Sequence, residues 1–190
     1  KGARFLIRGV TTSAGLAAAA IAHHHGAIVA ATSRKPERAE LLRSNGAAQV
    51  FIDQGAIADD VRKIYPNGVD KVLELVGTAT LLDSLHCAAP QGIVCMTGIV
   101  GNRWSLDQFS PMDAIPTSVC LTSYAGETAD FMSTTLQDLI AQSNAGTLRV
   151  SIGQVFSLDQ LVEAQRCLDE NKAGGKIVVR AQGRQTGEGN

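Results

Sequence analysis

The chain has 190 residues, of which 45% are hydrophobic and only 4% aromatic, and 17 Lys and Arg face 18 Asp and Glu. This composition is typical of a globular chain with one large domain, alone or with a further fragment. The net charge of −1 excludes the basic surface that binds nucleic acid or an anionic membrane. No run approaches the roughly 18 apolar residues that span a bilayer, and the first residues lack the apolar region of a secretory signal, so we expect a cytoplasmic protein.

Short apolar runs alternate with longer helical patterns from residue 4 onward. We expect strands at about 4–8, 27–32, 48–52, 70–76 and 92–97, and helices at about 13–25, 35–45, 57–64 and 78–88. Each helix is followed by a turn signal, namely Gly26, Gly46, Pro66-Asn67-Gly68 and Pro90-Gln91-Gly92. The strands are apolar throughout, as in sheets that are covered on both faces. The alternation therefore predicts an α/β fold, a Rossmann-type doubly wound parallel sheet with helices on both faces.

After residue 98 the regular alternation gives way to a loop in which Pro111 and Pro116 discourage regular structure. We expect the elements that follow to be a strand near 118–124, a helix near 129–144, a β-like piece at 148–156, an amphipathic helix at 158–170 and a last strand at 176–180. Three parts result: a dinucleotide-binding domain over 1–147, a C-terminal segment over 148–180, and a polar, frayed tail over 181–190.

The first expected strand runs into the turn Gly-Val-Thr-Thr-Ser-Ala-Gly, which opens an alanine-rich helix. At this place a dinucleotide-binding unit holds its pyrophosphate, because the backbone N–H groups of a helix N-terminus are unpaired and the helix dipole favours an anion. Gly9 permits a sharp exit from the strand, and Gly15 lets the helix approach closely. The candidate phosphate-binding residues are Gly9, Thr11, Thr12, Ser13, Ala14 and Gly15. The alternative is that the Ser/Thr cluster only caps the helix.

The end of the second expected strand carries Ser33, Arg34 and Lys35 where NAD-preferring folds place a carboxylate for the ribose hydroxyls. Ser33 is able to donate a hydrogen bond, Arg34 to grip or stack over a phosphorylated ribose, and Lys35 to add a positive charge. The segment therefore predicts NADP(H) as the cofactor. The alternative is an exposed helix start, although basic residues are unfavourable beside the positive end of the dipole.

Other constellations do not support a metal site or a different chemistry. His23, His24 and His25 are consecutive, so on a helix they point about 100° apart and cannot converge on one ion. His86 and Cys87 have no third ligand nearby, and the four cysteines form no C-x-x-C pair. We therefore predict no metal. The chain also lacks the Tyr-x-x-x-Lys pair of short-chain dehydrogenases, a P-loop, and the strand-two carboxylate of methyltransferases.

These features together resemble the medium-chain dehydrogenase/reductase superfamily, most closely its quinone oxidoreductase-like and zinc-type alcohol dehydrogenase-like branch. The resemblance rests on the turn, the Ser-Arg-Lys strand end, Glu-Leu-Val-Gly at 74–77, Gly-Ile-Val-Cys-Met-Thr-Gly at 92–98 and Ala-Gly-Gly-Lys-Ile-Val-Val at 173–179. It covers roughly residues 1–180. The family turn has the form A/G-x-x-G-x-x-G, and Thr12 replaces its middle glycine.

The resemblance implies further cofactor contacts. Asp53 would lie near the adenosine, and the ends of the fourth and fifth strands would line the ribose and nicotinamide side of the cleft, at Val76, Gly77, Thr78, Gly98, Ile99 and Val100. In relatives the strand corresponding to 118–124 joins two sheets into a homodimer. The segment matching 148–180 packs there on a GroES-like catalytic domain of more than a hundred residues, which precedes the first strand, holds any catalytic zinc and forms most of the substrate pocket.

This chain starts directly at the first strand, so by resemblance it is the cofactor-binding half of a reductase. We expect it to bind NADP(H) for hydride transfer to a small carbonyl, enone or quinone substrate, and to turn over weakly, if at all, as this fragment. The alternative is a stand-alone, non-catalytic nucleotide-binding or sensing domain. Neither the substrate nor the proton donor is identified by the sequence.

Overall fold

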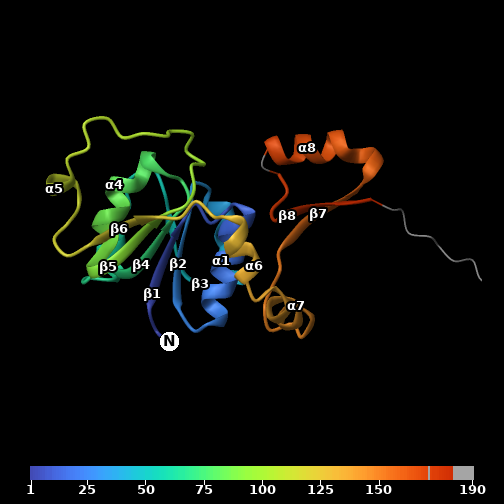
Figure 1. Cartoon of the computed structure of the whole chain (residues 1–190), viewed down its shortest axis with the longest axis horizontal. Helices are drawn as coiled ribbons and strands as arrows, with labels where there is room; N and C mark the ends of the chain where they lie inside the picture. Colours follow the sequence, from blue (N-terminus) through green and yellow to red (C-terminus); the bar gives the residue numbers. More distant parts are fainter. Residues whose placement is uncertain (171, 182–190) are drawn as a thin grey trace, which may run out of the picture. The chain divides into compact units, whose positions relative to one another are not determined.

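The computed structural model describes residues 1–170 and 172–181 (Figure 1). Contacts divide the chain into two compact units, Lys1–Val150 and Ser151–Asn190. Of the expected tail, residues 182–190 lie outside the described part of the chain. No helix in the described ranges is long and apolar enough to cross a membrane.

The first unit is built on one six-stranded sheet, in which every strand pair is parallel. Its strands are β1 (Arg4–Arg8), β2 (Ile28–Ser33), β3 (Ala47–Ile52), β4 (Val69–Glu74), β5 (Ala88–Met96) and β6 (Cys120–Ser123). Their spatial order is β3-β2-β1-β4-β5-β6. The order reverses between β1 and β4, which is the topological switch point of a doubly wound sheet.

Helices follow the strands as the alternating pattern predicts. They are α1 (Ser13–His24), the 3₁₀ turn η1 (Pro36–Arg38), α2 (Ala39–Ser44), α3 (Ala58–Ile64), α4 (Thr78–Cys87), α5 (Pro111–Ala114), α6 (Thr128–Ser133) and α7 (Leu136–Asn144). In α1 a run of alanines provides high helix propensity and a narrow surface, so the helix lies close to the sheet. The residues Ala19 and Ala22 on its inner side are buried.

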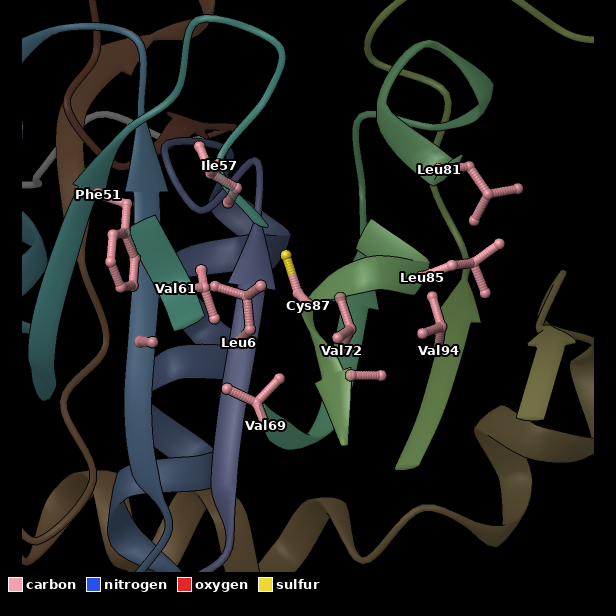
Figure 2. Packing of buried hydrophobic residues seen from close by; sticks show 12 residues of the cluster. Leu6, Phe51, Ile57, Val61, Val69, Val72, Leu81, Leu85, Cys87 and Val94 are labelled. Carbon is pink, nitrogen blue, oxygen red and sulfur yellow. The ribbon is translucent and has the colours of Figure 1, made fainter. Parts of the chain in front are cut away.

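Two apolar clusters cover opposite faces of the sheet, because neighbouring strand residues point to opposite sides. Leu6 of β1 belongs to a cluster closed by Val61 of α3 and Leu85 of α4, part of which Figure 2 shows. Its neighbour Ile7 belongs to the other cluster, which Leu16 of α1 and Leu42 of α2 complete. The predicted Rossmann-type fold with helices on both faces is confirmed.

Two local predictions about prolines were wrong. The Pro90–Gly92 turn does not close a helix. It forms a bulge inside β5, where Ala88 pairs with Val69 and Ile93 with Lys71, and a bulge is where a strand tolerates proline. Pro111 begins the short helix α5 at its first position, where no N–H donor is needed.

The predicted helix 129–144 breaks into α6 and α7, because Thr134 is extended with ψ 134°. The hydroxyls of Ser133 and Thr134 both donate to the carbonyl oxygen of Asp130, at 2.9 Å each, and so compete with the backbone ladder.

The second unit contains β7 (Ile152–Ser157), the 3₁₀ turn η2 (Leu158–Gln160), α8 (Leu161–Asp169) and β8 (Lys176–Arg180), and β7 pairs with β8 in parallel. Ser157 and Gln160 form a capping box at the start of η2. Among its described residues only Ala164 is buried, whereas Leu161, Val162 and Leu168 are exposed. The unit therefore has little core of its own.

Candidate dinucleotide-binding site

The predicted cofactor residues lie at one edge of the first unit's sheet, where the carboxyl ends of its parallel strands meet. Residues 9–15 follow β1, residues 33–35 end β2, Asp53 follows β3, residues 76–78 follow β4 and residues 98–100 follow β5. In open α/β sheets, ligands bind at this edge beside the switch point. The fold thus brings the predicted segments to one edge, on both sides of β1 and β4.

The turn after β1 ends in a helix N-terminus with free amides. Thr12 caps α1, since its Oγ1 accepts a hydrogen bond from the Gly15 amide at 3.0 Å and donates one to the Gly9 carbonyl at 3.2 Å. The amides of Ser13 and Ala14 make no hydrogen bond within the described part of the chain, and the first turn of α1 carries no acidic residue. These two donors and the helix dipole suit an anion.

Both glycines of this turn have the structural roles that the sequence predicts. Gly9 leaves β1 with φ +85°, a conformation that other L-residues rarely adopt. A Cβ on Gly15 would lie 2.6 Å from the Cα of Val10, so only glycine permits this approach. Thr12 stands at the middle glycine position of the family motif, and its side chain is folded into the turn as the helix cap.

The end of β2 forms a short turn closed by Ser33. The Ser33 hydroxyl donates to the Lys35 carbonyl and accepts from the Lys35 amide, both at 3.0 Å. Its proton is therefore already used, although the sequence suggested that Ser33 donates to a ligand. Arg34 and Lys35 are exposed, and within the described residues neither side chain has a hydrogen bond or an ion pair. The turn presents two free positive charges.

Asp53 is buried and already paired, which the sequence did not indicate. Its Oδ2 accepts from Arg8 Nε at 2.7 Å, and its Oδ1 accepts from Arg8 Nη2 at 3.0 Å and from the Gly55 amide at 2.9 Å. Burial alone would raise the pKa of Asp53, but the hydrogen bond and charge of Arg8 outweigh it and hold the pKa below its usual value. Both oxygens are thus committed to the protein's own donors.

Arg8 is the fully buried centre of this pairing, a role that was not predicted from its place in the sequence. Its Nη1 also binds Asp83 Oδ2 of α4 at 2.6 Å. Its remaining partners are Ser84 Oγ and the carbonyl oxygens of Gly55 and Thr80. Burial disfavours the charged form, but Asp53 and the other carboxylates raise the pKa of Arg8 above its usual value. An arginine ending an apolar strand was the one available signal, because a buried guanidinium needs an acidic partner.

Glu74, at the end of β4, is also fully buried, and its role was not predicted either. Its Oε1 accepts from the amides of Val76 and Gly77, and its Oε2 accepts from the hydroxyls of Thr80 and Ser84. Burial raises the pKa of Glu74, and the hydrogen bonds from Ser84 and Gly77 only partly offset it.

The ends of β4 and β5 lie against each other through glycines. Gly77 has φ +101°, and a Cβ there would lie 2.8 Å from the Gly98 carbonyl oxygen. The Val100 amide donates to the Leu75 carbonyl at 3.1 Å. Thr78 is buried, and its hydroxyl donates to the Arg103 carbonyl at 2.5 Å. Of the residues predicted at these two strand ends, Val100 is the most open to solvent.

No group of three or more His, Cys, Asp or Glu side chains that could hold a metal exists in the described ranges. His23, His24 and His25 are exposed at the end of α1, as expected for a solvated helix end. Cys87 is buried, and burial raises the pKa of its thiol to about 12. The described residues therefore do not fit a zinc ion.

A parallel sheet of this order, with a glycine turn and a helix N-terminus at its switch point, defines the Rossmann class of dinucleotide-binding folds. The sequence profile of the zinc-binding dehydrogenases matches residues 14–142. The chain belongs to this family, within the medium-chain dehydrogenase/reductase superfamily.

The chain is also similar to individual oxidoreductases. The chain is 28% identical over 182 residues to the quinone oxidoreductase of Sus scrofa, covering 92% of this chain and 53% of the relative. The structure is similar to 2-haloacrylate reductase, with TM-score 0.79, 25% identity and coverage of 96% and 58%. A mycobacterial protein solved in complex with NADPH gives TM-score 0.77, 25% identity and coverage of 94% and 56%. The chain thus spans about half the length of the relatives that it matches.

Proposed function

We propose that this chain is the NADP(H)-binding part of an oxidoreductase that transfers hydride to a small carbonyl, enone or quinone substrate. The observation that carries the proposal is the pair Arg34 and Lys35 at the end of β2, where an NAD-preferring fold has a carboxylate. Both side chains are exposed and have no partner within residues 1–170 and 172–181. A mycobacterial neighbour bound to NADPH supports the same cofactor. The names quinone oxidoreductase and 2-haloacrylate reductase support the substrate class.

In this proposal each segment of the edge has one task. The amides of Ser13 and Ala14 bind the pyrophosphate. Gly9 and Gly15 have no side chains, so they leave room for it beside the turn. Arg34 and Lys35 bind the 2′-phosphate. The turns after β4 and β5 orient the nicotinamide, whose ring supplies the hydride chemistry when bound. Because no side chain of this edge is assigned as a proton donor, we propose that the 190 residues alone bind cofactor but turn over poorly.

The test is a titration of the 190-residue chain with NADPH and NADH, beside Arg34→Ala. We expect the unaltered chain to prefer NADPH and the variant to lose about tenfold or more of its NADPH affinity, because a hydrogen bond to a charged group is lost. NADH affinity should stay the same. Arg43→Ala is the matched control, since Arg43 is also exposed but lies at the C-terminal end of α2. Equal affinity for both cofactors in the unaltered chain would refute the proposal.

We further propose that two copies pair through β6. This strand is one edge of the six-stranded sheet, and its outer side is unpaired within the described unit. Such an edge favours addition of another strand. Sedimentation of the chain at increasing concentration tests this, with a dimer expected and a monomer at all concentrations contradicting it. A cytoplasmic location stays a prediction.

A further inference from the structure

A buried carboxylate sits directly beneath the turn after β4. Glu74 has no exposed surface, yet four donors converge on it. The Val76 amide lies 2.7 Å and the Gly77 amide 3.0 Å from Oε1, while the Thr80 hydroxyl lies 3.0 Å and the Ser84 hydroxyl 2.5 Å from Oε2. An ionisable group in this position is unfavourable for stability, because apolar side chains of similar size fill a core at lower cost.

The contacts show what Glu74 holds in place. Its Oε1 binds both amides of the turn, while the carbonyl of Val76 accepts from the Gly101 amide at 2.8 Å and that of Gly77 from the Thr80 amide at 3.1 Å. The turn is therefore fixed from two sides, in a conformation with φ +101° at Gly77. Without Glu74, the half-buried amide of Val76 and the buried amide of Gly77 would lose this partner, and the turn would need to change shape to satisfy them.

The Val76–Thr78 turn lies beside the turn after β1, residues 9–15, which we call the phosphate turn. A Cβ on Gly9 would lie 3.2 Å from Val76 Cγ2, so the Val76 side chain packs directly against Gly9. On the other side, Gly77 lies against the carbonyl of Gly98 after β5. Val76 and Gly77 thus form the floor between the phosphate turn and the end of β5, where the proposed function places the nicotinamide half of the cofactor.

The carboxylate is also linked to the Arg8 pairing. The Ser84 hydroxyl donates to Glu74 and accepts from Arg8 Nη1 at 3.0 Å. Arg8 in turn holds Asp53 after β3 and Asp83 of α4. One connected buried network therefore anchors Glu74 to the ends of β1 and β3.

We infer that Glu74 is a positioning residue, which orients the Val76–Thr78 turn for the nicotinamide half of NADP(H) without touching the 2′-phosphate end. This inference rests on the proposed function. On this view the two halves of the cofactor bind different parts of the site. The adenosine 2′-phosphate contacts the β2 turn, whereas the nicotinamide contacts the Val76–Thr78 turn, which Glu74 supports.

The experiment compares NADPH with adenosine 2′,5′-bisphosphate, which keeps the adenosine and the 2′-phosphate but lacks the nicotinamide. Calorimetric titration of the full 190-residue chain is done for Glu74→Leu, Glu74→Asp and Glu74→Gln. We expect Glu74→Leu to weaken NADPH binding about tenfold while adenosine 2′,5′-bisphosphate binds within about twofold of the unaltered chain. Glu74→Asp keeps the charge but is one methylene shorter, and we expect about threefold weaker NADPH binding.

Glu74→Gln tests whether hydrogen-bond geometry rather than charge matters. Its amide oxygen still accepts from Val76 and Gly77, and its amide group faces the hydroxyls of Thr80 and Ser84, so NADPH affinity should be restored to near that of the unaltered chain. If Glu74→Leu does not fold by circular dichroism, the Asp and Gln variants decide.

Each result separates the two proposals. An equal loss of both ligands in the Leu or Asp variant would mean a general structural role and would overturn the inference. Unchanged NADPH affinity in these variants, or a loss in Glu74→Gln as large as in Glu74→Asp, would overturn it as well. Failure of the unaltered chain to bind either ligand would instead refute the proposed function.

Discussion

At the β2 end of the candidate site, Arg34 and Lys35 are exposed on a turn that Ser33 closes with two local hydrogen bonds. At the β4 end, Arg8 and Glu74 are fully buried, and Arg8 reaches a partner 76 positions away in the sequence. The positive charges of Arg34 and Lys35 are open to a ligand. The charged groups of Arg8 and Glu74 instead hydrogen-bond to the protein and hold its backbone in place. On the proposed function, cofactor selectivity and cofactor position therefore come from separate sets of residues.

The largest loss of stability is expected at Arg8, the centre of the buried pairing. Replacing it by Met leaves Asp53 and Asp83 without their main partner, and Asp53 is buried. We expect the free energy of unfolding to fall by about 3 kcal/mol, since removal of one partner leaves an uncompensated buried charge. Urea denaturation of Arg8→Met measures this, and Arg43→Met is the exposed control. A change below about 1 kcal/mol would mean that the buried pairing contributes little to the fold.

A smaller loss should come from Gly15→Ala. In an unhindered helix this change stabilises by up to about 1 kcal/mol, but here the new Cβ would lie 2.6 Å from the Val10 backbone. We expect a net loss of about 1 to 3 kcal/mol and weaker NADPH binding, because α1 must move away from the turn. Thermal unfolding and titration are the measurements, with Ala17→Ser, at an exposed position of the same helix, as the control. A gain in stability would show that the close approach is not required.

The smallest effect should appear in the pH dependence of stability. The pKa of Asp53 lies below its usual value, so its stabilising contribution is present above about pH 4. It is lost as the pH falls through the lowered pKa of the folded protein. Urea midpoints between about pH 5 and 2 should therefore fall less steeply in Asp53→Asn than in the unaltered chain. Parallel slopes would argue against the Arg8–Asp53 pairing.

Much of the fold could be predicted because its signals are local. β1 matches its apolar run residue for residue, and β2, β3 and β4 are displaced from their runs by no more than two residues at either end. The turn after β1 could be predicted because glycine, a capping threonine and a small-residue helix follow one another directly. Arg34 and Lys35 stand out because the strand end lacks a carboxylate, and their contact with a 2′-phosphate stays a prediction.

The rest depends on partners that are distant in sequence. The place of Asp53 near the adenosine stays a prediction, but its pairing with Arg8, 45 positions away, could not be predicted from the sequence. The break between α6 and α7 depends on two hydroxyls that turn back to Asp130. The bulge in β5 is set by its register with β4. None of these contacts is visible in a local pattern of apolar and polar residues.

The self-contained turn at Ser33 has a consequence for how such a domain changes during evolution. Because the hydroxyl of Ser33 closes the turn on the backbone of Lys35, the scaffold does not depend on which side chains follow it. Arg34 and Lys35 can then be exchanged in a few mutational steps with little penalty to stability, since their side chains make no hydrogen bond or ion pair among the described residues. If Arg34 and Lys35 select the cofactor as we propose, a lineage can change its preference between the two nicotinamide dinucleotides at the surface while its interior stays the same.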